Sequence, residues 1–276
     1  MTYWNAVLLG LVQGVAEFLP ISSSGHLAVL QNFLAIGDME NHMLFDVLLH
    51  LGTLAAVILA FWKDVREVVT EFARMLHIRR TPRGMKPNRR ERRLISFLII
   101  ATLPLIPAAF LSNVVESLYQ NTFFIGFAFI LTGFLLFAAD RMGHGNKDER
   151  SSTTADALVV GLAQAAAVVP GLSRSGTTIT ACLLCGFEKK FAVKYSFIMS
   201  IPAVLGAVVL ELKDVAKAPL QASAVPACAV ATVISAIVGY LSICIMMRLI
   251  QGKKYKIFAV YCAIVGLITV GYGIFR

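Results

Sequence analysis

The sequence predicts an all-α polytopic membrane protein with six transmembrane helices and two re-entrant helix-loop-helix hairpins. Of the 276 residues, 58% are hydrophobic and only 15% are charged, and the mean hydropathy is +0.75. This composition is too apolar for a soluble globule. Six apolar runs are long enough to cross a hydrocarbon core of about 30 Å. Two further apolar segments are interrupted near their middle, which predicts broken helices.

The six candidate spans follow one another from the first third of the chain to its end. They lie at residues 42–62, 94–113, 121–140, 195–212, 223–250 and 257–275. No cleaved signal peptide is expected before them, because residues 1–4 carry no basic side chain and the next apolar run contains Gln13 and Glu17. The whole chain, 1–276, is therefore expected to be one membrane domain.

The two interrupted segments are residues 4–34 and 157–186. The first is broken by the run from Pro20 to Gly25, and the second by the run from Pro170 to Gly176. Proline removes a backbone donor, and irregular backbone is tolerated at membrane depth only where protein surrounds it. Each segment is therefore expected to form two half-helices joined by a buried loop.

The two interrupted segments are also copies of one motif. Placing residue 10 on residue 161 aligns GLVQGVAEFLPISSSGHL with GLAQAAAVVPGLSRSGTT, with seven identities in 18 positions and no gap. We expect repeat 1 at about 4–62 and repeat 2 at about 157–212. Because three predicted spans separate the hairpins, the second copy enters the membrane from the opposite side. This is the inverted-topology pattern of many transporters.

The net charge of +9 comes mostly from one connecting segment. Eleven of the 25 basic residues lie between Lys63 and Arg93. This concentration is typical of a cytoplasmic loop under the positive-inside rule, and in a membrane protein it argues against a nucleic-acid partner. With this basic loop at 63–93 inside, both termini and the mouth of the first hairpin lie outside, and the second hairpin opens inward.

Polar residues of the first hairpin predict a functional site. Gln13 and Glu17 lie four residues apart on one helical face. A carboxylate in hydrocarbon costs about 3 kcal/mol or more unless it is paired or bound, which favours a functional role over a structural hydrogen bond. Ser22, Ser23, Ser24 and Gly25 then precede a half-helix, whose free N–H groups form an anion seat. His26 follows as a candidate acid-base group, with packing or capping as the alternative.

The second hairpin repeats the anion seat and adds a guanidinium. Arg174 is the only basic residue in either hairpin, and its side chain suits bidentate binding of phosphate oxygens. A simple ion pair between Arg174 and Glu17 is the alternative, but it leaves the serine clusters unexplained. The predicted phosphate-binding residues of this hairpin are Ser173, Arg174, Ser175, Gly176, Thr177 and Thr178.

Asp46 and His50 lie one turn apart near the outer start of the first full span. They are candidates for lining the approach to the site, although capping by Asp46 and packing by His50 explain them equally well. Together, the residues describe a phosphate site with acid-base capability among lipids, so a phospholipid-like substrate is expected. A transporter or flippase of an anionic lipid is the main alternative, and a structural scaffold is a weaker one.

These motifs resemble those of the bacterial undecaprenyl-diphosphate phosphatases, also called bacitracin-resistance proteins. The first family motif appears as Gln13-Gly-Val-Ala-Glu17-Phe18-Leu19-Pro20, followed by Ser22-Ser-Ser-Gly-His26, and the second as Pro170-Gly-Leu-Ser173-Arg174-Ser175-Gly176-Thr177-Thr178. The resemblance extends to Leu48–Thr53 and Phe197–Ala207, and the length and span pattern cover the whole chain.

The resemblance implies hydrolysis of undecaprenyl diphosphate to the monophosphate carrier of peptidoglycan synthesis, at the outer face of the bacterial cytoplasmic membrane. It implies a divalent cation, Mg²⁺ or Ca²⁺, with Glu17 and Gln13 as candidate ligands. Some members have Glu at the position of Gln13, so a two-carboxylate metal site is in doubt here. Bacitracin is expected to compete by binding the substrate, and a homodimer remains an open possibility.

The mechanistic hypothesis gives the two hairpins different roles. Arg174 and the backbone N–H groups of residues 173–178 hold the diphosphate, while Glu17 and Gln13 orient a cation or His26. His26 acts as general base or nucleophile, with Ser22 or Ser23, activated by His26, as the rival nucleophile. The sequence does not choose between them.

Overall fold

The computed structural model describes residues 2–33, 42–78, 88–142, 145–215, 225–252 and 255–274, and within them the fold is helical apart from one isolated β-bridge, Lys147 with Phe187. The elements, in chain order, are α1 Tyr3–Ala16, α2 Ser23–Phe33, α3 His42–Ala60, α4 Trp62–Met75, α5 Arg89–Thr102, α6 Leu105–Ala109, α7 Ser112–Tyr119, α8 Thr122–Arg141, α9 Thr154–Ala166, α10 Arg174–Leu184, α11 Lys189–Val215, α12 Val225–Leu249, the 3₁₀ turn η2 Ile250–Gly252 and α13 Tyr255–Ile274.

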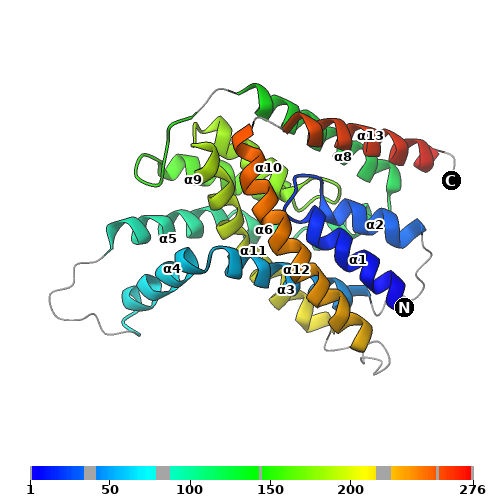
Figure 1. The fold of residues 1–276 in the computed structure, drawn as a ribbon, viewed down its shortest axis with the longest axis horizontal. Helices are drawn as coiled ribbons and strands as arrows, with labels where there is room; N and C mark the ends of the chain where they lie inside the picture. The colour runs from blue at the N-terminus through cyan, green and yellow to red at the C-terminus, as the bar shows by residue number, and fades with distance from the viewer. Residues whose placement is uncertain are drawn as a thin grey trace.

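Five helical stretches among the described residues are long and apolar enough to cross a membrane. They are Arg89–Ala109, Thr122–Arg141, Lys189–Leu210, Val225–Gly252 and Tyr255–Ile274. A sixth is added if the bent pair Leu44–Ala60 and Trp62–Met75 counts as one span. All six predicted runs therefore fall on helices, and the multi-span membrane class is confirmed. The start of α1 and the end of α13 lie on one side of the molecule, opposite the start of α5 (Figure 1).

The two interrupted segments form pairs of short helices, as predicted, although each break lies three residues earlier than the expected runs 20–25 and 170–176, because the serine turns already begin the second helix of each pair. The pair α1 and α2 is broken at residues 17–22, and the pair α9 and α10 at residues 167–173. Each of these helices has 11 to 14 residues, fewer than the roughly 20 needed to cross a bilayer. Their starts carry side-chain caps: Thr2 accepts from the N–H of Asn5, and Thr153 forms a capping box with Asp156.

Glycines set how closely these short helices approach their neighbours. A Cβ on Gly10 of α1 would lie 2.7 Å from the carbonyl oxygen of Ala231 in α12. The residue 151 positions later, Gly161 of α9, approaches Ala101 of α5 equally closely, at 2.7 Å. The two copies thus use the same glycine to pack against different partners. Small residues at such contacts are typical of helix pairs in membranes.

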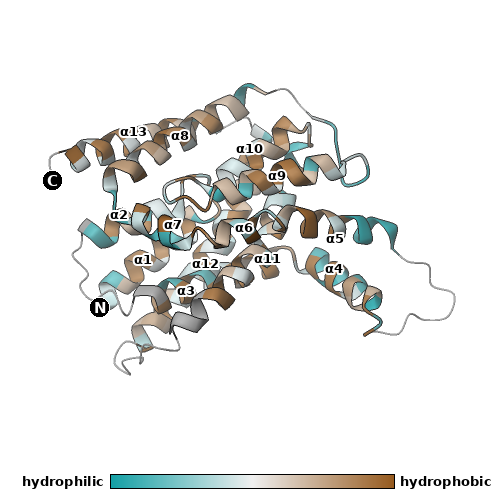
Figure 2. Cartoon of the chain, turned by 180° about the vertical axis from the view of Figure 1, so that it is seen from behind, coloured by the Kyte–Doolittle hydropathy of each residue, from teal (hydrophilic) through white to brown (hydrophobic). Residues whose placement is uncertain are grey.

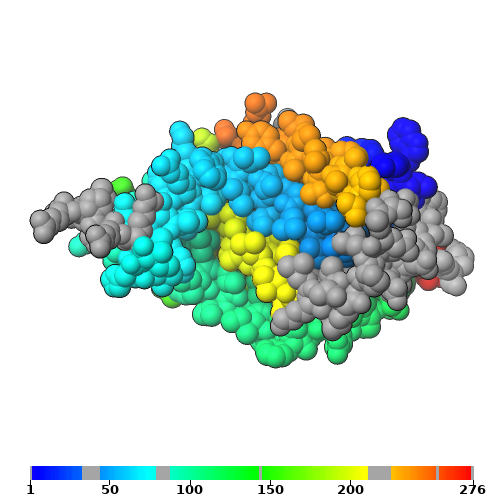
Figure 3. Space-filling view, turned by 90° about the horizontal axis from the view of Figure 1, so that it is seen from below, coloured from blue at the N-terminus to red at the C-terminus, as the bar shows by residue number. Residues whose placement is uncertain are grey.

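The longer helices surround the short pairs. Helix α3 packs against both α12 and α11, and α8 packs along α13. Figure 3 shows α3 in blue between α12 in orange and α11 in yellow. In Figure 2, α8 and α13 are coloured mostly as hydrophobic, in contrast with the hydrophilic start of α5.

The basic stretch 63–93, expected as one connecting loop, in fact contains a helix and the start of another. Helix α4 occupies Trp62–Met75 and turns by 91° from α3, and α5 begins at Arg89. The sequence gives the reason for the early start of α5, because the Asn88 side chain accepts from the backbone N–H groups of Arg90 and Glu91. The predicted span 94–113 correspondingly begins earlier and is interrupted after Thr102, where Pro104 precedes the short helix α6.

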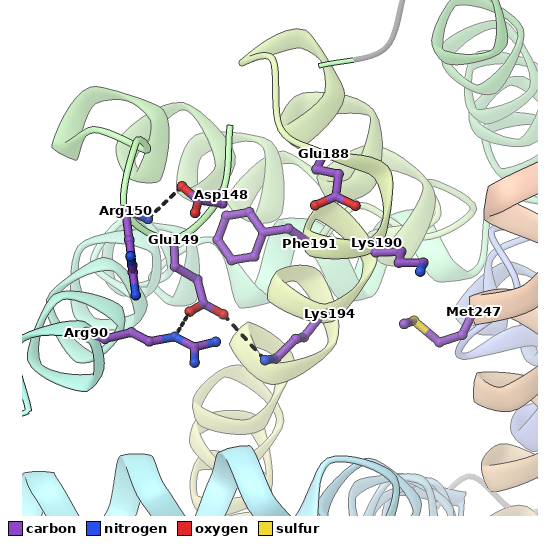
Figure 4. Close-up of a pocket in the computed structure, with 9 residues that line it drawn as sticks. All are labelled: Arg90, Asp148, Glu149, Arg150, Glu188, Lys190, Phe191, Lys194 and Met247. Carbon is purple, nitrogen blue, oxygen red and sulfur yellow. Dashed lines mark hydrogen bonds and ion pairs between the residues drawn. The ribbon is translucent and has the colours of Figure 1, made fainter. Parts of the chain in front are cut away.

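Charged side chains gather in a pocket at this end of the molecule, away from the helix breaks. Glu149 accepts hydrogen bonds from Arg90 of α5 and from Lys194 of α11, the latter at 3.4 Å, as Figure 4 shows. Burial alone would raise the pKa of Glu149, but these two cations together lower it, so the carboxylate stays ionised at neutral pH. None of the predicted site residues lines this pocket.

Candidate active site

The breaks in the two helix pairs meet in the interior of the molecule. Gly25, in the first turn of α2, lies against Gly171 of the second break, and a Cβ on it would be 2.9 Å from the Cα of Gly171. A second contact between the breaks is a hydrogen bond from the Ser175 hydroxyl to the carbonyl of Leu19, at 3.4 Å. The predicted residues of both motifs are therefore brought into one site.

Both breaks end in the same hydrogen-bonded turn. The backbone N–H of Gly25 donates to Ser22 Oγ at 3.3 Å, and 151 residues later the N–H of Gly176 donates to Ser173 Oγ at 3.1 Å. The hydroxyls of Ser173 and Ser175 are 3.3 Å apart, and those of the matching Ser22 and Ser24 are 3.4 Å apart. The internal duplication read from the sequence is thus reproduced in the local geometry.

A threonine of α8 satisfies the backbone of the second break. Thr132 Oγ1 accepts from the N–H of Ser173 at 3.1 Å and donates to the carbonyl of Gly171 at 3.2 Å. Unpaired backbone groups are costly away from water, so this side chain makes irregular backbone tolerable here. Thr132 is absent from the sequence-based site, although a buried hydroxyl within an apolar span is the signal that marks it.

Glu17 is held from three directions at the end of the first half-helix. Gln13 Nε2 donates to its carboxylate at 3.1 Å, the Ser23 hydroxyl at 2.6 Å, and Arg174 forms an ion pair with the remaining oxygen. The Glu17 side chain is only 5% exposed, against 18% for Arg174. A pair this buried is costly to break, because either partner alone would be an uncompensated charge.

Arg174 has donor capacity left over. Its Nη2 contacts Glu17, whereas Nη1 is buried and has no hydrogen-bond partner among the described residues. A buried donor without a partner is uncommon and calls for an explanation, such as a ligand. The guanidinium stands at the first residue of α10, where the helix dipole also favours an anion. This arrangement is suited to a phosphate group.

His26 is fixed by contacts to both ring nitrogens. Nδ1 is 2.7 Å from the carbonyl oxygen of Ser22, and Nε2 is 2.7 Å from the hydroxyl of Tyr261. The edge of the ring meets Phe129, with centroids 4.9 Å apart. The imidazole contacts the backbone carbonyl of Ser22 and not its hydroxyl, which accepts from the N–H of Gly25. The Ser23 hydroxyl donates to Glu17. The geometry thus favours His26 itself over an activated serine.

Tyr261 is a site residue that the sequence did not reveal. It lies on α13, 235 positions after His26, in a mainly apolar helix that also contains Lys256 and two further tyrosines. Its ring stacks on His26 with an interplanar angle of 11° and a centroid distance of 5.7 Å. A phenol in an apolar helix has a polar end that needs a partner, which is the only signal available in the sequence.

The predicted phosphate-binding threonines have different surroundings. Thr178 is fully buried, and its hydroxyl contacts the carbonyl of Arg174 at 2.8 Å and the hydroxyl of Ser196 at 2.6 Å. That hydroxyl links α10 to α11 instead of facing the break. Thr177 Oγ1, in contrast, is buried and has no partner in the structure. It remains available to a ligand.

Asp46 and His50 lie beside the site. His50 Nδ1 is 2.8 Å from the carbonyl of Asp46, and Gln31 Nε2 donates to the Asp46 carboxylate at 3.2 Å. His50 is close enough to Glu17 to act on it electrostatically. The pair therefore belongs to the surroundings of Glu17, while His26 contacts a different part of the break.

The protein supplies few ligands for a metal ion at the site. In the described part of the chain, no three His, Cys, Asp or Glu side chains are grouped to hold one. Near the break there are the Glu17 carboxylate and the buried Oε1 of Gln13, which has no partner. Both are oxygen donors of the kind that Mg²⁺ and Ca²⁺ prefer, but a cation would need further oxygens from a bound phosphate.

Fold and site together define a multi-span membrane protein with two buried helix breaks, where a carboxylate pairs with a guanidinium and an imidazole is held by the backbone of the first break. The chain belongs to the family described as bacitracin resistance protein BacA, whose sequence profile matches residues 6–268. Three relatives carry the name undecaprenyl-diphosphatase. That of Methanosphaera stadtmanae is 38% identical over 96% of each chain, that of Alkaliphilus metalliredigens 39% over 98% of each, and that of Methanobrevibacter smithii 41% over 96% of this chain and 95% of the relative.

Proposed function

We propose that the chain hydrolyses undecaprenyl diphosphate to undecaprenyl phosphate and inorganic phosphate. The observation that carries the proposal is the buried Arg174, whose free Nη1 stands at the N-terminus of α10 beside Glu17. A diphosphate group would supply the acceptor that this nitrogen lacks. Membership in the family and the names of its relatives point to the same substrate.

In this proposal the second break binds and the first break reacts. Arg174, the N–H groups at the start of α10 and the Thr177 hydroxyl bind the diphosphate. His26 either attacks the terminal phosphorus through Nε2 or removes the proton from an attacking water. Both routes break the bond between the terminal phosphorus and the bridging oxygen, so the lipid monophosphate is the leaving group. In the first route water then hydrolyses the phosphohistidine and releases inorganic phosphate, whereas the second route gives inorganic phosphate directly.

A divalent cation, Mg²⁺ or Ca²⁺, would be held by Glu17 and Gln13 Oε1 together with oxygens of the substrate. It would supply charge neutralisation for the diphosphate. Because Glu17 now pairs with Arg174, we expect the substrate to compete for the guanidinium and so free a carboxylate oxygen.

We also propose the finer topology: six spans with two re-entrant hairpins as inverted repeats in the bacterial cytoplasmic membrane. Supporting it are the matching turns in the two breaks and the basic residues concentrated between Lys63 and Arg93. This orientation directs the first break to the outer face. Bacitracin would then inhibit by binding the substrate on that side.

The test is phosphate release from undecaprenyl diphosphate by the purified protein in detergent, compared with His26→Ala and Arg174→Ala. Wild-type protein should release phosphate and both variants should lose nearly all activity. The helix breaks also fit a lipid transporter, so the same preparations are assayed for lipid transport in vesicles. Transport without phosphate release would replace the phosphatase proposal with the transporter.

A further inference from the structure

The contact between His26 and Tyr261 joins the first motif to the last helix of the chain. The Tyr261 hydroxyl is 2.7 Å from His26 Nε2, and the two rings are stacked. Tyr261 remains 40% exposed, so it stands at the edge of the site instead of in the core. Packing alone requires neither the hydroxyl nor its direction.

The protonation of the imidazole follows from its other nitrogen. Nδ1 lies 2.7 Å from the carbonyl oxygen of Ser22, which only accepts hydrogen bonds, so Nδ1 carries a proton. In the neutral ring Nε2 then holds the lone pair, and the Tyr261 hydroxyl donates to it. Ser22 has φ of 69°, an unusual conformation for a residue other than glycine, and its carbonyl accepts from both the N–H and the Nδ1 of His26.

We propose that Tyr261 is a positioning residue for His26. Its hydroxyl orients the imidazole so that the Nε2 lone pair is directed out of the first break, and it covers that lone pair in the absence of substrate. When substrate binds, the hydroxyl donates to a phosphate oxygen instead. Nε2 is then uncovered beside the bound diphosphate. The inference rests on the proposed role of His26 in phosphate release and adds a residue from α13 to it.

Tyr261→Phe tests the inference, since it removes the hydroxyl and keeps the stacked ring. The control is Tyr240→Phe on α12, a tyrosine with similar exposure, 42%, and with no contact to His26 in the described structure. Two readouts are taken on full-length protein: kcat and KM for undecaprenyl diphosphate, and the rate at which diethyl pyrocarbonate modifies His26 relative to His50, resolved by peptide mass spectrometry.

We expect Tyr261→Phe to lower kcat about ten-fold with no rise in KM, because the imidazole is no longer oriented toward the diphosphate before the reaction. His26 modification should accelerate relative to His50, because Nε2 is uncovered. General loosening of the fold would accelerate both histidines. Tyr240→Phe should match wild type in both readouts.

Either readout of Tyr261→Phe equal to that of Tyr240→Phe overturns the inference. Its failure is distinguishable from failure of the proposed function. If His26→Ala retains wild-type phosphate release, the role of His26 is wrong. If His26→Ala is inactive while Tyr261→Phe behaves as the control, only the role of Tyr261 is wrong.

Discussion

The two helix breaks share a sequence pattern and a capping turn, yet they bend the backbone at different places. In the first break the residue in the left-handed region is Ser22, with φ of 69°, and in the second it is Gly171, with φ of 88°. By the alignment, Gly171 corresponds to Pro20 and Ser22 to Ser173. Ser173 itself has an ordinary φ of −67°. The second copy therefore has its unusual backbone conformation at the glycine, and the first has it at Ser22, whose carbonyl contacts His26.

The difference fits the two roles proposed for the breaks. The carbonyl of Ser22 accepts from both the N–H and the ring Nδ1 of His26, whereas the carbonyl of Ser173 accepts only the N–H of Thr177 among the described contacts, at 2.8 Å. The first break thus orients a ring. In the second break the position of Ser23 is taken by Arg174, which reaches across to Glu17. The copies are complementary, because the first has an imidazole and no guanidinium, and the second has a guanidinium and no imidazole.

The largest expected effect comes from removing the side chain that joins the breaks. Arg174→Ala should lower kcat by about 10³-fold, the scale for losing a charged group that stabilises a transferring phosphoryl. It should also destabilise the fold by about 3 kcal/mol, since Glu17 is left buried without its cation. Phosphate release and thermal unfolding in detergent measure the two effects.

Arg174→Lys separates binding geometry from charge. It keeps a cation for Glu17, so most of the stability should return while most of the activity does not. Arg150→Ala, an exposed cation in the distant charged pocket, is the control. Full activity in Arg174→Lys would show that charge alone suffices and that the guanidinium does not bind phosphate through two donors.

The second effect separates the two unusual backbone positions. Gly171→Ala should destabilise the protein by about 3 kcal/mol, because φ is positive and the new Cβ would meet the Ile125 carbonyl oxygen at 2.7 Å and Ala128 Cβ at 2.8 Å. Ser22→Gly should change stability by less than about 1 kcal/mol, since relief of the backbone strain offsets the lost hydroxyl. Thermal unfolding of the two variants measures the contrast. Equal destabilisation would contradict it.

The sequence predicted the parts of the site that are local and missed those that arrive from distant helices. The breaks and the repeat follow from proline and serine in an apolar context, whereas the ion pair of Glu17 with Arg174, which the structure shows, was only the alternative to phosphate binding by Arg174. Thr132 and Tyr261 contribute through tertiary packing from α8 and α13, which no spacing in the sequence encodes. Helix α4 was missed because its charges indicated a loop, although they segregate to one helical face.

The third prediction concerns the cation and compares the matching glutamines. Both glutamines have a buried Oε1 without a partner among the described residues, but Gln13 Nε2 donates to Glu17, whereas Gln164 Nε2 donates to the carbonyl of Ala101 at 3.4 Å. Gln13→Ala should raise the Mg²⁺ concentration for half-maximal activity about ten-fold. Gln164→Ala should leave it unchanged. Titration of Mg²⁺ after chelator treatment measures both, and an equal shift in the two variants would exclude a cation at the first break.

The smallest effect tests whether the capping turns are equivalent. Ser22→Ala and Ser173→Ala each remove the oxygen that accepts from a glycine N–H, at positions 25 and 176, and each should cost about 1 kcal/mol of unfolding free energy. Activity should separate them, because losing the Ser22 hydroxyl loosens the turn whose backbone carbonyl orients His26, whereas the turn at Ser173 orients no imidazole. We therefore expect Ser22→Ala to lower kcat further than Ser173→Ala, by about three-fold, at equal stability. Should Ser173→Ala be the more damaging to kcat, the assignment of reaction to the first break and binding to the second would have to be reversed.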